Sequence, residues 1–190
     1  AIFKIDITFP GYHGFAFDNV NDGSFTGGRF EALDPSVGST KALFKGAGVA
    51  INHCTDIKVS NITCHNLKAS CQMYHSKSCT ISNCLGYRDR VYVNSIENGT
   101  FFGGYSGQYN LIENCQTYGG CKDGDIYHYG SGYGNRIDQC KAFFTELGDD
   151  TYKILGLLNQ GLGLDSGQDS GSITNCTASV SYTHLRAHET

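Results

Sequence analysis

One short pattern recurs along most of this chain, and it limits the fold more than any other feature of the sequence. Its two clearest copies follow each other within residues 104–143, 25 residues apart. Turn-forming residues and single apolar residues that keep constant places in successive copies are typical of a stacked repeat. The shared elements are a Ser-Gly pair, an isoleucine and an amide-Cys pair: Ser106-Gly107, Ile112 and Asn114-Cys115, then Ser131-Gly132, Ile137 and Gln139-Cys140.

Aligning each copy on its central apolar residue, the anchor, extends the register over most of the chain. Successive anchors are 34, 22, 31, 25 and 36 residues apart, which indicates a short basic coil into which loops of different length are inserted. The anchors are Phe25, Val59, Ile81, Ile112, Ile137 and Ile173. We expect the four isoleucines among them to be stacked on one another and buried.

Two columns of residues follow the anchors. Two positions after the anchor stands Asn, Gly or Gln, and because Asn and Gly adopt left-handed backbone at low cost, this column predicts a repeated turn. Three positions after the anchor stands a small or apolar residue, usually Cys, which predicts a repeated core position. The turn column is Gly27, Asn61, Asn83, Asn114, Gln139 and Asn175, and the core column is Gly28, Ile62, Cys84, Cys115, Cys140 and Cys176.

Composition excludes several other classes of protein. The chain has 25 Gly and only 2 Pro, and none of its apolar runs approaches the roughly 18 residues that a membrane-spanning helix requires. Its net charge of −4 gives no basic surface for nucleic acid. We therefore expect neither a membrane nor nucleic acid as a partner.

The nine cysteines lie mainly where a core is expected. Residues of one column in a stack lie about 4.8 Å from their neighbours, so small thiols there would form a buried ladder. A disulfide between Cys115 and Cys121 is the alternative, and no pair has the CxxC spacing of a structural zinc site. The cysteine count leaves the redox compartment open.

These columns, with their short coils and their Asn and Cys ladders, resemble the right-handed parallel β-helices of the pectin-lyase-like superfamily over about residues 15–179. The predicted fold is therefore all-β: a right-handed parallel β-helix of about six coils, in a single domain spanning residues 1–180. The resemblance implies a polysaccharide as partner, because members of this superfamily are mostly polysaccharide lyases, hydrolases and epimerases, with some phage tailspikes and adhesins. It also favours an extracellular or phage-surface location.

Both ends of the chain depart from the pattern. The sequence starts without methionine, so we expect it to lack its native N-terminus. The last ten residues, SYTHLRAHET, drop glycine and alternation abruptly and resemble translated sequencing-adapter read-through. Residues 181–190 are therefore expected to be a non-native tail.

Carboxylates gather on two neighbouring copies of the repeat. Asp125 and Asp150 each stand thirteen residues after an anchor, and Asp123 and Asp149 lie next to them. Like charges about 5 Å apart disfavour joint ionisation, which raises at least one pKa and yields the proton donor and acceptor that glycosidic hydrolysis needs. These four aspartates are the predicted catalytic residues, and their KDGDI and GDD segments resemble the aspartate layout of polygalacturonase-type hydrolases.

Alternation along the strands predicts which other side chains face a ligand. Counting back from the anchors places Ile51, Met73 and Tyr129 in the core. The opposite parity brings aromatic and polar side chains to the surface of the same sheet, where aromatic rings can stack on sugar rings. The surface set is Tyr74, Tyr105, His128 and, after a one-residue insertion, Asp165. An ordinary surface with scattered tyrosines is the alternative.

Three functions remain open. A hydrolase would use the stacked aspartates. A lyase or epimerase would need a base such as His128, cations such as Lys122 and Lys153, and often Ca²⁺ to neutralise a uronate. A non-catalytic tailspike or adhesin module would need only the repetitive surface, and its acids would be a Ca²⁺ site or a solvated edge. Ca²⁺ is thus the one candidate cofactor.

A metal site built on histidine is the less favoured interpretation of a second column. His53 and His75 both stand six residues before their anchors, where later copies have Ser106 and Ser131. Two imidazoles alone make a weak metal site, so an ordinary turn position is the prediction.

Overall fold

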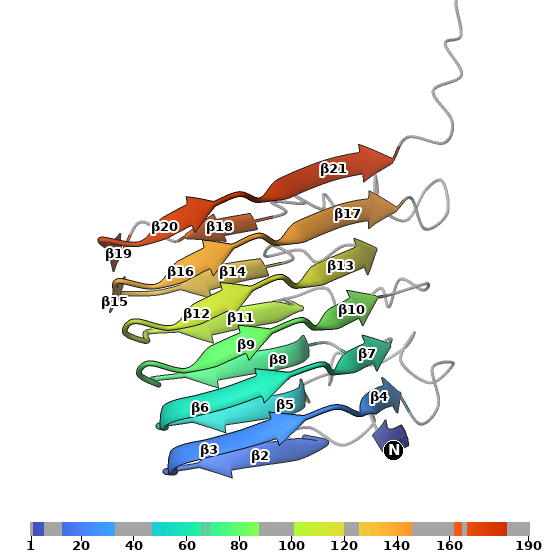
Figure 1. Cartoon of the computed structure of the whole chain (residues 1–190), viewed down its shortest axis with the longest axis horizontal. Helices are drawn as coiled ribbons and strands as arrows, with labels where there is room; N and C mark the ends of the chain where they lie inside the picture. Colours follow the sequence, from blue (N-terminus) through green and yellow to red (C-terminus); the bar gives the residue numbers. More distant parts are fainter. Residues whose placement is uncertain are drawn as a thin grey trace, which may run out of the picture.

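The structure is a computed structural model, and it describes residues 2–5, 13–32, 47–65, 67, 69–87, 101–119, 126–145, 162–164 and 167–181. Within these residues all regular secondary structure is β-strand, and none forms a helix that could cross a membrane. The strands build three long parallel sheets that wind around one core (Figure 1).

The strands of each sheet follow the order of the chain, with parallel pairing throughout. Sheet A contains β1 (Ile2–Ile5), β4 (Arg29–Ala32), β7 (Thr63–His65), β10 (Leu85–Tyr87), β13 (Gln116–Gly119), β17 (Lys141–Thr145) and β21 (Thr177–Ser181). Sheet B contains β2 (Phe15–Asp18), β5 (Ala47–Asn52), β8 (Ala69–Tyr74), β11 (Phe102–Tyr105), β14 (Ile126–Tyr129) and β18 (Leu162–Leu164). Sheet C contains β3 (Asn21–Thr26), β6 (Thr55–Ser60), β9 (Thr80–Ser82), β12 (Leu111–Glu113), β16 (Arg136–Asp138) and β20 (Ser172–Thr174). A small fourth sheet pairs β15 (Gly132–Tyr133) with β19 (Gln168–Asp169).

Each coil runs through sheet B, then sheet C, then sheet A, and the next coil stacks on it (Figure 1). The described strands form six coils, from β2-β3-β4 to β18-β20-β21, with β1 as an additional strand of sheet A. The fourth coil is β11-β12-β13, and the fifth is β14-β16-β17. This arrangement confirms the predicted parallel β-helix of about six coils.

The anchor register is confirmed residue by residue. The anchors are Cα partners in sheet C from Phe25 through Ile137 to Ile173. Val59, Ile81, Ile112 and Ile137 are almost fully buried. The predicted burial of Ile173 is wrong, because β20 pairs on one side only and the side chain stays 41% exposed.

The turn that links sheet C to sheet A has the predicted backbone in all six coils. Every member of the turn column has positive φ, from 48° at Asn114 to 76° at Gly27. The exposed amides also bond along the stack, since Asn114 Nδ2 donates to Asn83 Oδ1 at 2.5 Å. Left-handed backbone is tolerated best by Gly and Asn, which accounts for the composition of the column.

The core column after this turn is a ladder of thiols. Cys84, Cys115 and Cys140 are buried and Cys176 is half-buried, so the predicted ladder is confirmed. Cys115 is a free thiol, which rules out the alternative disulfide with Cys121. Burial also raises the pKa of the Cys71 thiol on β8 well above its ordinary value, so this thiol stays neutral.

A second buried column lies inside the turns that link sheet B to sheet C, here called the B–C turns. Its members are Cys79, Asn110 and Asn135, with Ile57 at the equivalent place on β6, and the two asparagines are fully buried. Asn110 accepts a hydrogen bond from Cys79 N and donates one to Ser76 O, both 2.9 Å long. Asn135 in turn accepts from Asn110 N at 2.9 Å and donates to Gly107 O at 2.8 Å. Buried amides thus bond the third coil to the fourth and the fourth to the fifth.

Ser181, the first residue of the predicted non-native tail, belongs to strand β21. It is the last residue of that strand and pairs with Thr145. Residues 182–190 lie outside the described residues.

Candidate functional site

The outer face of sheet B holds a column of tyrosines in register. Tyr74 pairs with Tyr105, and Tyr105 pairs with Tyr129, so the three residues take equivalent places on β8, β11 and β14. Asn52 on β5 continues the column below. Because neighbouring parallel strands lie about 4.8 Å apart, the column places one aromatic side chain on each of three successive coils.

The structure confirms the predicted surface positions of Tyr74 and Tyr105. In the next coil, however, the residues predicted to face outward and inward are exchanged. His128 was predicted at the surface and is instead 1% exposed, in the core column of Ile51, Met73 and Gly104. Tyr129 was predicted in the core and is half-buried, in the outer column.

One extra residue in a turn explains the reversal. Tyr105 pairs with Tyr129, and Gln108 pairs with Tyr133. The two positions are three residues apart in the fourth coil, from Tyr105 to Gln108, but four residues apart in the fifth coil, from Tyr129 to Tyr133. Counting back from Ile137 therefore lands one residue too late. For the same reason the column of His53 and His75 holds Ser106 and then Gly130, rather than Ser131.

His128 is a neutral core residue. Its ring fills the space left by Gly104, where a Cβ would lie 2.4 Å from His128 Nδ1. Nε2 lies 3.4 Å from Arg136 O, and burial lowers the pKa of the imidazole to about 4. A side chain inside the coil does not reach a ligand on the outer face, so His128 is no longer part of the candidate site.

The tyrosines of the outer column differ in how much ring they expose. Tyr105 is 48% exposed, whereas Tyr74 is half-buried and its hydroxyl donates to Gln72 Oε1. Burial raises the pKa of Tyr74. The Tyr129 ring lies 4.4 Å from that of Tyr127, with an interplanar angle of 33°. Parity counting missed Tyr127 and Tyr129; comparing the lengths of the two B–C turns would have found them.

Two histidines border this face where the B–C turns begin. The rings of His53 and His75 are stacked with centroids 5.2 Å apart, and the His75 ring meets that of Tyr105 edge-on at 5.9 Å. Their φ angles are 51° and 48°, which confirms the predicted turn position. Among the described residues no three His, Cys, Asp or Glu side chains come together as metal ligands.

The remaining predicted site residues lie outside the described residues: Asp123, Asp125, Asp149, Asp150, Lys122, Lys153 and Asp165. In the chain, Asp125 directly precedes β14, and Asp165 directly follows β18. The carboxylates predicted from the repeat therefore flank, in sequence, two strands of the same sheet that carries the tyrosines.

The side chains of the described part of this face are suited to contacts with a sugar. Tyrosine rings stack on the C–H faces of sugars, while Gln72 and Asn52 supply amides that can bond sugar hydroxyls. Comparisons of the chain with protein-family models, with curated proteins and with solved structures found no match.

Proposed function

We propose that this protein binds a polysaccharide along the outer face of sheet B, with the chain of sugars running across successive coils. The observation that carries the proposal is the register of Tyr74, Tyr105 and Tyr129, which gives three neighbouring strands an aromatic side chain at one position. A repeated surface suits a repeated ligand, because each coil offers the next sugar an equivalent contact.

The chemistry of this face supports a saccharide more than a purely apolar partner. Tyr105 presents a ring that is 48% exposed. On the same face, the amides of Gln72 and Asn52 and the imidazole of His75 can donate or accept hydrogen bonds. Aromatic rings next to amides are a combination that satisfies both the C–H and the O–H groups of a sugar.

The likeness to the pectin-lyase-like superfamily points in the same direction. It rests on the repeated Ser-Gly pair, isoleucine and amide-Cys pair, and the parallel β-helix that this repeat predicts is present in the structure. Membership of that superfamily is part of this proposal, as is an extracellular or phage-surface location.

Hydrolysis of the bound polysaccharide is the second candidate function, favoured by one observation. Asp125 directly precedes β14, which carries Tyr129, so an aspartate of the predicted catalytic set is adjacent in the chain to the aromatic face. In this version Asp123, Asp125, Asp149 and Asp150 supply the proton donor and acceptor, with Lys122 and Lys153 at the substrate. A lyase with His128 as its base loses support, because that imidazole is buried.

The binding test uses electrophoresis of the protein through gels that contain polygalacturonate, xylan or mixed-linkage β-glucan. We expect at least one polymer to retard the protein, and Tyr105→Ala to weaken the retardation by about three- to tenfold, the equivalent of about 0.5–1.5 kcal/mol for one aromatic contact. The matched control is Tyr118→Ala, an exposed tyrosine on sheet A. Equal effects of the two substitutions would contradict a site on sheet B.

Catalysis is tested by incubating the protein with the polymer that binds. New reducing ends without ultraviolet absorbance from unsaturated products indicate a hydrolase, and Asp125→Asn and Asp150→Asn should then each remove most of the activity. Unsaturated products would indicate a lyase. Binding with no products at all would leave a non-catalytic module.

A further inference from the structure

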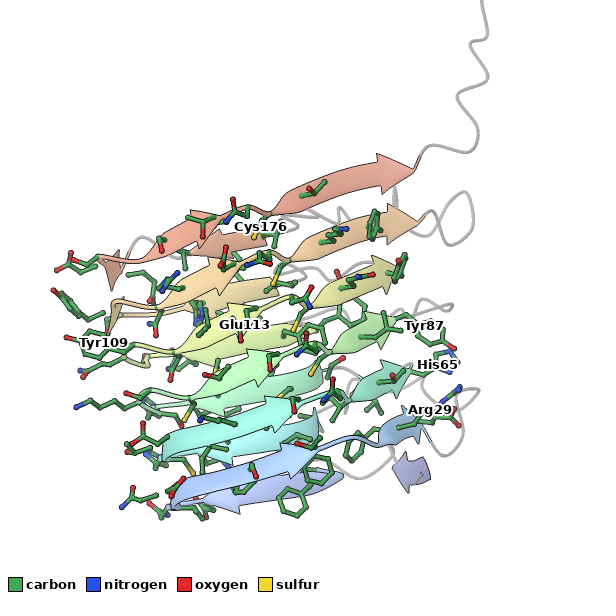
Figure 2. All side chains as sticks on the ribbon, in the orientation of Figure 1. Arg29, His65, Tyr87, Tyr109, Glu113 and Cys176 are labelled. Carbon is green, nitrogen blue, oxygen red and sulfur yellow. The ribbon has the colours of Figure 1, made fainter. Side chains whose placement is uncertain are left out.

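Two exposed tyrosines of the described chain lie at neighbouring B–C turns. Tyr109, in the turn of the fourth coil, is 53% exposed, and Tyr133, in the turn of the fifth coil, is 43% exposed. Figure 2 shows Tyr109 at the edge of the stack, projecting away from the strands. Neither ring belongs to the core, so packing inside the coil does not account for either residue.

The backbone at Tyr109 is unusual for an aromatic residue. The residue occupies a left-handed position, with φ of 54°, that recurs in every coil. The equivalent residues are Asp22, Asp56, Ser78, Gly134 and Ser170, all of which are small or polar. A bulky side chain at positive φ is strained, and strain that packing does not repay is most often found at functional sites. The ring therefore requires an explanation outside the fold.

The fifth coil makes room for this ring. A Cβ at Gly134 would lie 2.7 Å from Cδ1 and 2.9 Å from Cε1 of Tyr109, so the ring packs directly against glycine backbone. Tyr133 meets it edge-on, with centroids 5.4 Å apart and an interplanar angle of 76°. Supported in this way by Gly134 and Tyr133, the Tyr109 ring still leaves half of its surface to solvent.

This cluster is continuous with the outer face of sheet B. Tyr105 ends β11 and stands four residues before Tyr109, at the other end of the same turn. Its Cζ lies 3.6 Å from the place that a Cβ of Gly130 would take. The two left-handed positions of the fifth B–C turn, Gly130 and Gly134, are thus both glycines. Gly130 lies against Tyr105, at the end of β11, and Gly134 lies against Tyr109.

Polar side chains flank the cluster along the stack. Tyr133 has a bridge partner on each side: Gln108 in the fourth coil and Asp169 in the sixth. Gln108 is in turn the partner of Lys77 in the third coil. A cation and an amide therefore lie on one side of Tyr133, and a carboxylate lies on the other. These groups can bond to hydroxyls on the rim of a sugar whose ring stacks on tyrosine.

We propose that Tyr109 and Tyr133 form a second sugar-binding subsite, which continues the sheet B face around the B–C turn and holds further units of the same polysaccharide chain. The inference rests on the proposed function. It adds that the ligand is a polymer long enough to cover both the tyrosines of sheet B and this subsite.

The test compares the polysaccharide that retards the protein most, among polygalacturonate, xylan and mixed-linkage β-glucan, with its own oligosaccharides of increasing length. The informative variant is Tyr109→Asn, because asparagine suits a φ of 54° and removes the ring without disturbing the turn. Ser78→Asn is the matched control, since Ser78 holds the equivalent position one coil earlier. Tyr133→Ala removes the second ring.

We expect Tyr109→Asn and Tyr133→Ala to weaken binding of the polymer about three- to tenfold, to leave binding of the shortest bound oligosaccharide unchanged, and not to lower the melting temperature. Tyr105→Ala should weaken both ligands, and Ser78→Asn neither. Unchanged polymer binding by both turn variants would overturn the subsite while leaving the sheet B face intact. Equal weakening of short and long ligands would also overturn it. Failure of the unaltered protein to bind any of the three polymers would remove the proposed function, and the subsite with it.

Discussion

Acid should destabilise this protein through one buried histidine. His128 lies in the core column of sheet B at 1% exposure, and burial lowers the pKa of its imidazole to about 4 from an ordinary value of 6.5. Between these two values the unfolded chain binds a proton that the folded chain excludes. The contribution of His128 to stability is therefore complete above about pH 6.5 and is lost progressively as the pH falls towards 4.

The size of the effect follows from the shift. The difference between a pKa of 6.5 and one of about 4, at about 1.4 kcal/mol per pH unit, corresponds to about 3.5 kcal/mol in full, of which about 2.5 kcal/mol is lost between pH 7.5 and pH 4.5. That is a large part of the roughly 5–15 kcal/mol by which domains are stable. Burial also lowers the pKa of His13, which adds to the loss in the same direction.

The assay is chemical unfolding in urea at several pH values between 7.5 and 4.5, on the unaltered protein and on His128→Leu. Leucine suits the site, because Leu164 occupies the same column on the next strand. We expect the unfolding free energy of the variant to depend less on pH, by about 2.5 kcal/mol over the range. The control His75→Asn replaces an exposed histidine and should keep the full dependence. Parallel curves for His128→Leu and the unaltered protein would refute the reasoning.

Three further predictions concern the stack itself. Ile112→Asp, at a fully buried position, should lower the free energy of unfolding by several kcal/mol and remove the cooperative unfolding transition seen by circular dichroism. Leu111→Asp, on the outer side of the same strand, should keep that transition. Similar results for the two variants would contradict the register. Asn114→Ala should lower the free energy of unfolding by about 1 kcal/mol, because alanine is strained at a φ of 48° and leaves Asn83 without its donor, while Asn114→Gly should cost less. A reducing agent should leave the melting temperature unchanged, because the eight cysteines of the described chain are free thiols; a clear fall on reduction would show a disulfide.

Much of the fold could be predicted because the repeat is local in sequence. The anchors, the left-handed Asn column and the Cys ladder are each defined by offsets of two or three residues, which insertions elsewhere do not disturb. His128 and Tyr129 were misplaced because they lie eight or nine residues before their anchor, on the far side of a turn that has gained one residue. The prediction that Ile173 is buried was wrong for another reason, because a residue in a column is buried only when a coil covers it on both sides.

The candidate site was harder to predict than the scaffold. Alternation identified Tyr74 and Tyr105, since both strands precede turns of equal length. It gave no reason to single out Tyr109 and Tyr133. The available signal was that Tyr109 stands in a turn column otherwise filled by Asp, Ser and Gly. This signal can be interpreted only together with Gly134 in the next coil, against which the Tyr109 ring packs. The predicted aspartates lie outside the described residues, so they stay a prediction.

The buried asparagines of the B–C turns also determine how the stack should respond to mechanical force. Sliding the fourth coil by one residue over the third would separate Asn110 from Cys79 N and Ser76 O at once, leaving buried polar groups without partners. At the equivalent place the first three coils have Gly23, Ile57 and Cys79, none of which carries an amide, so no buried side-chain amide bonds these coils to each other there. A pull along the axis should therefore part the N-terminal coils first, while the coils that carry the tyrosines stay locked together.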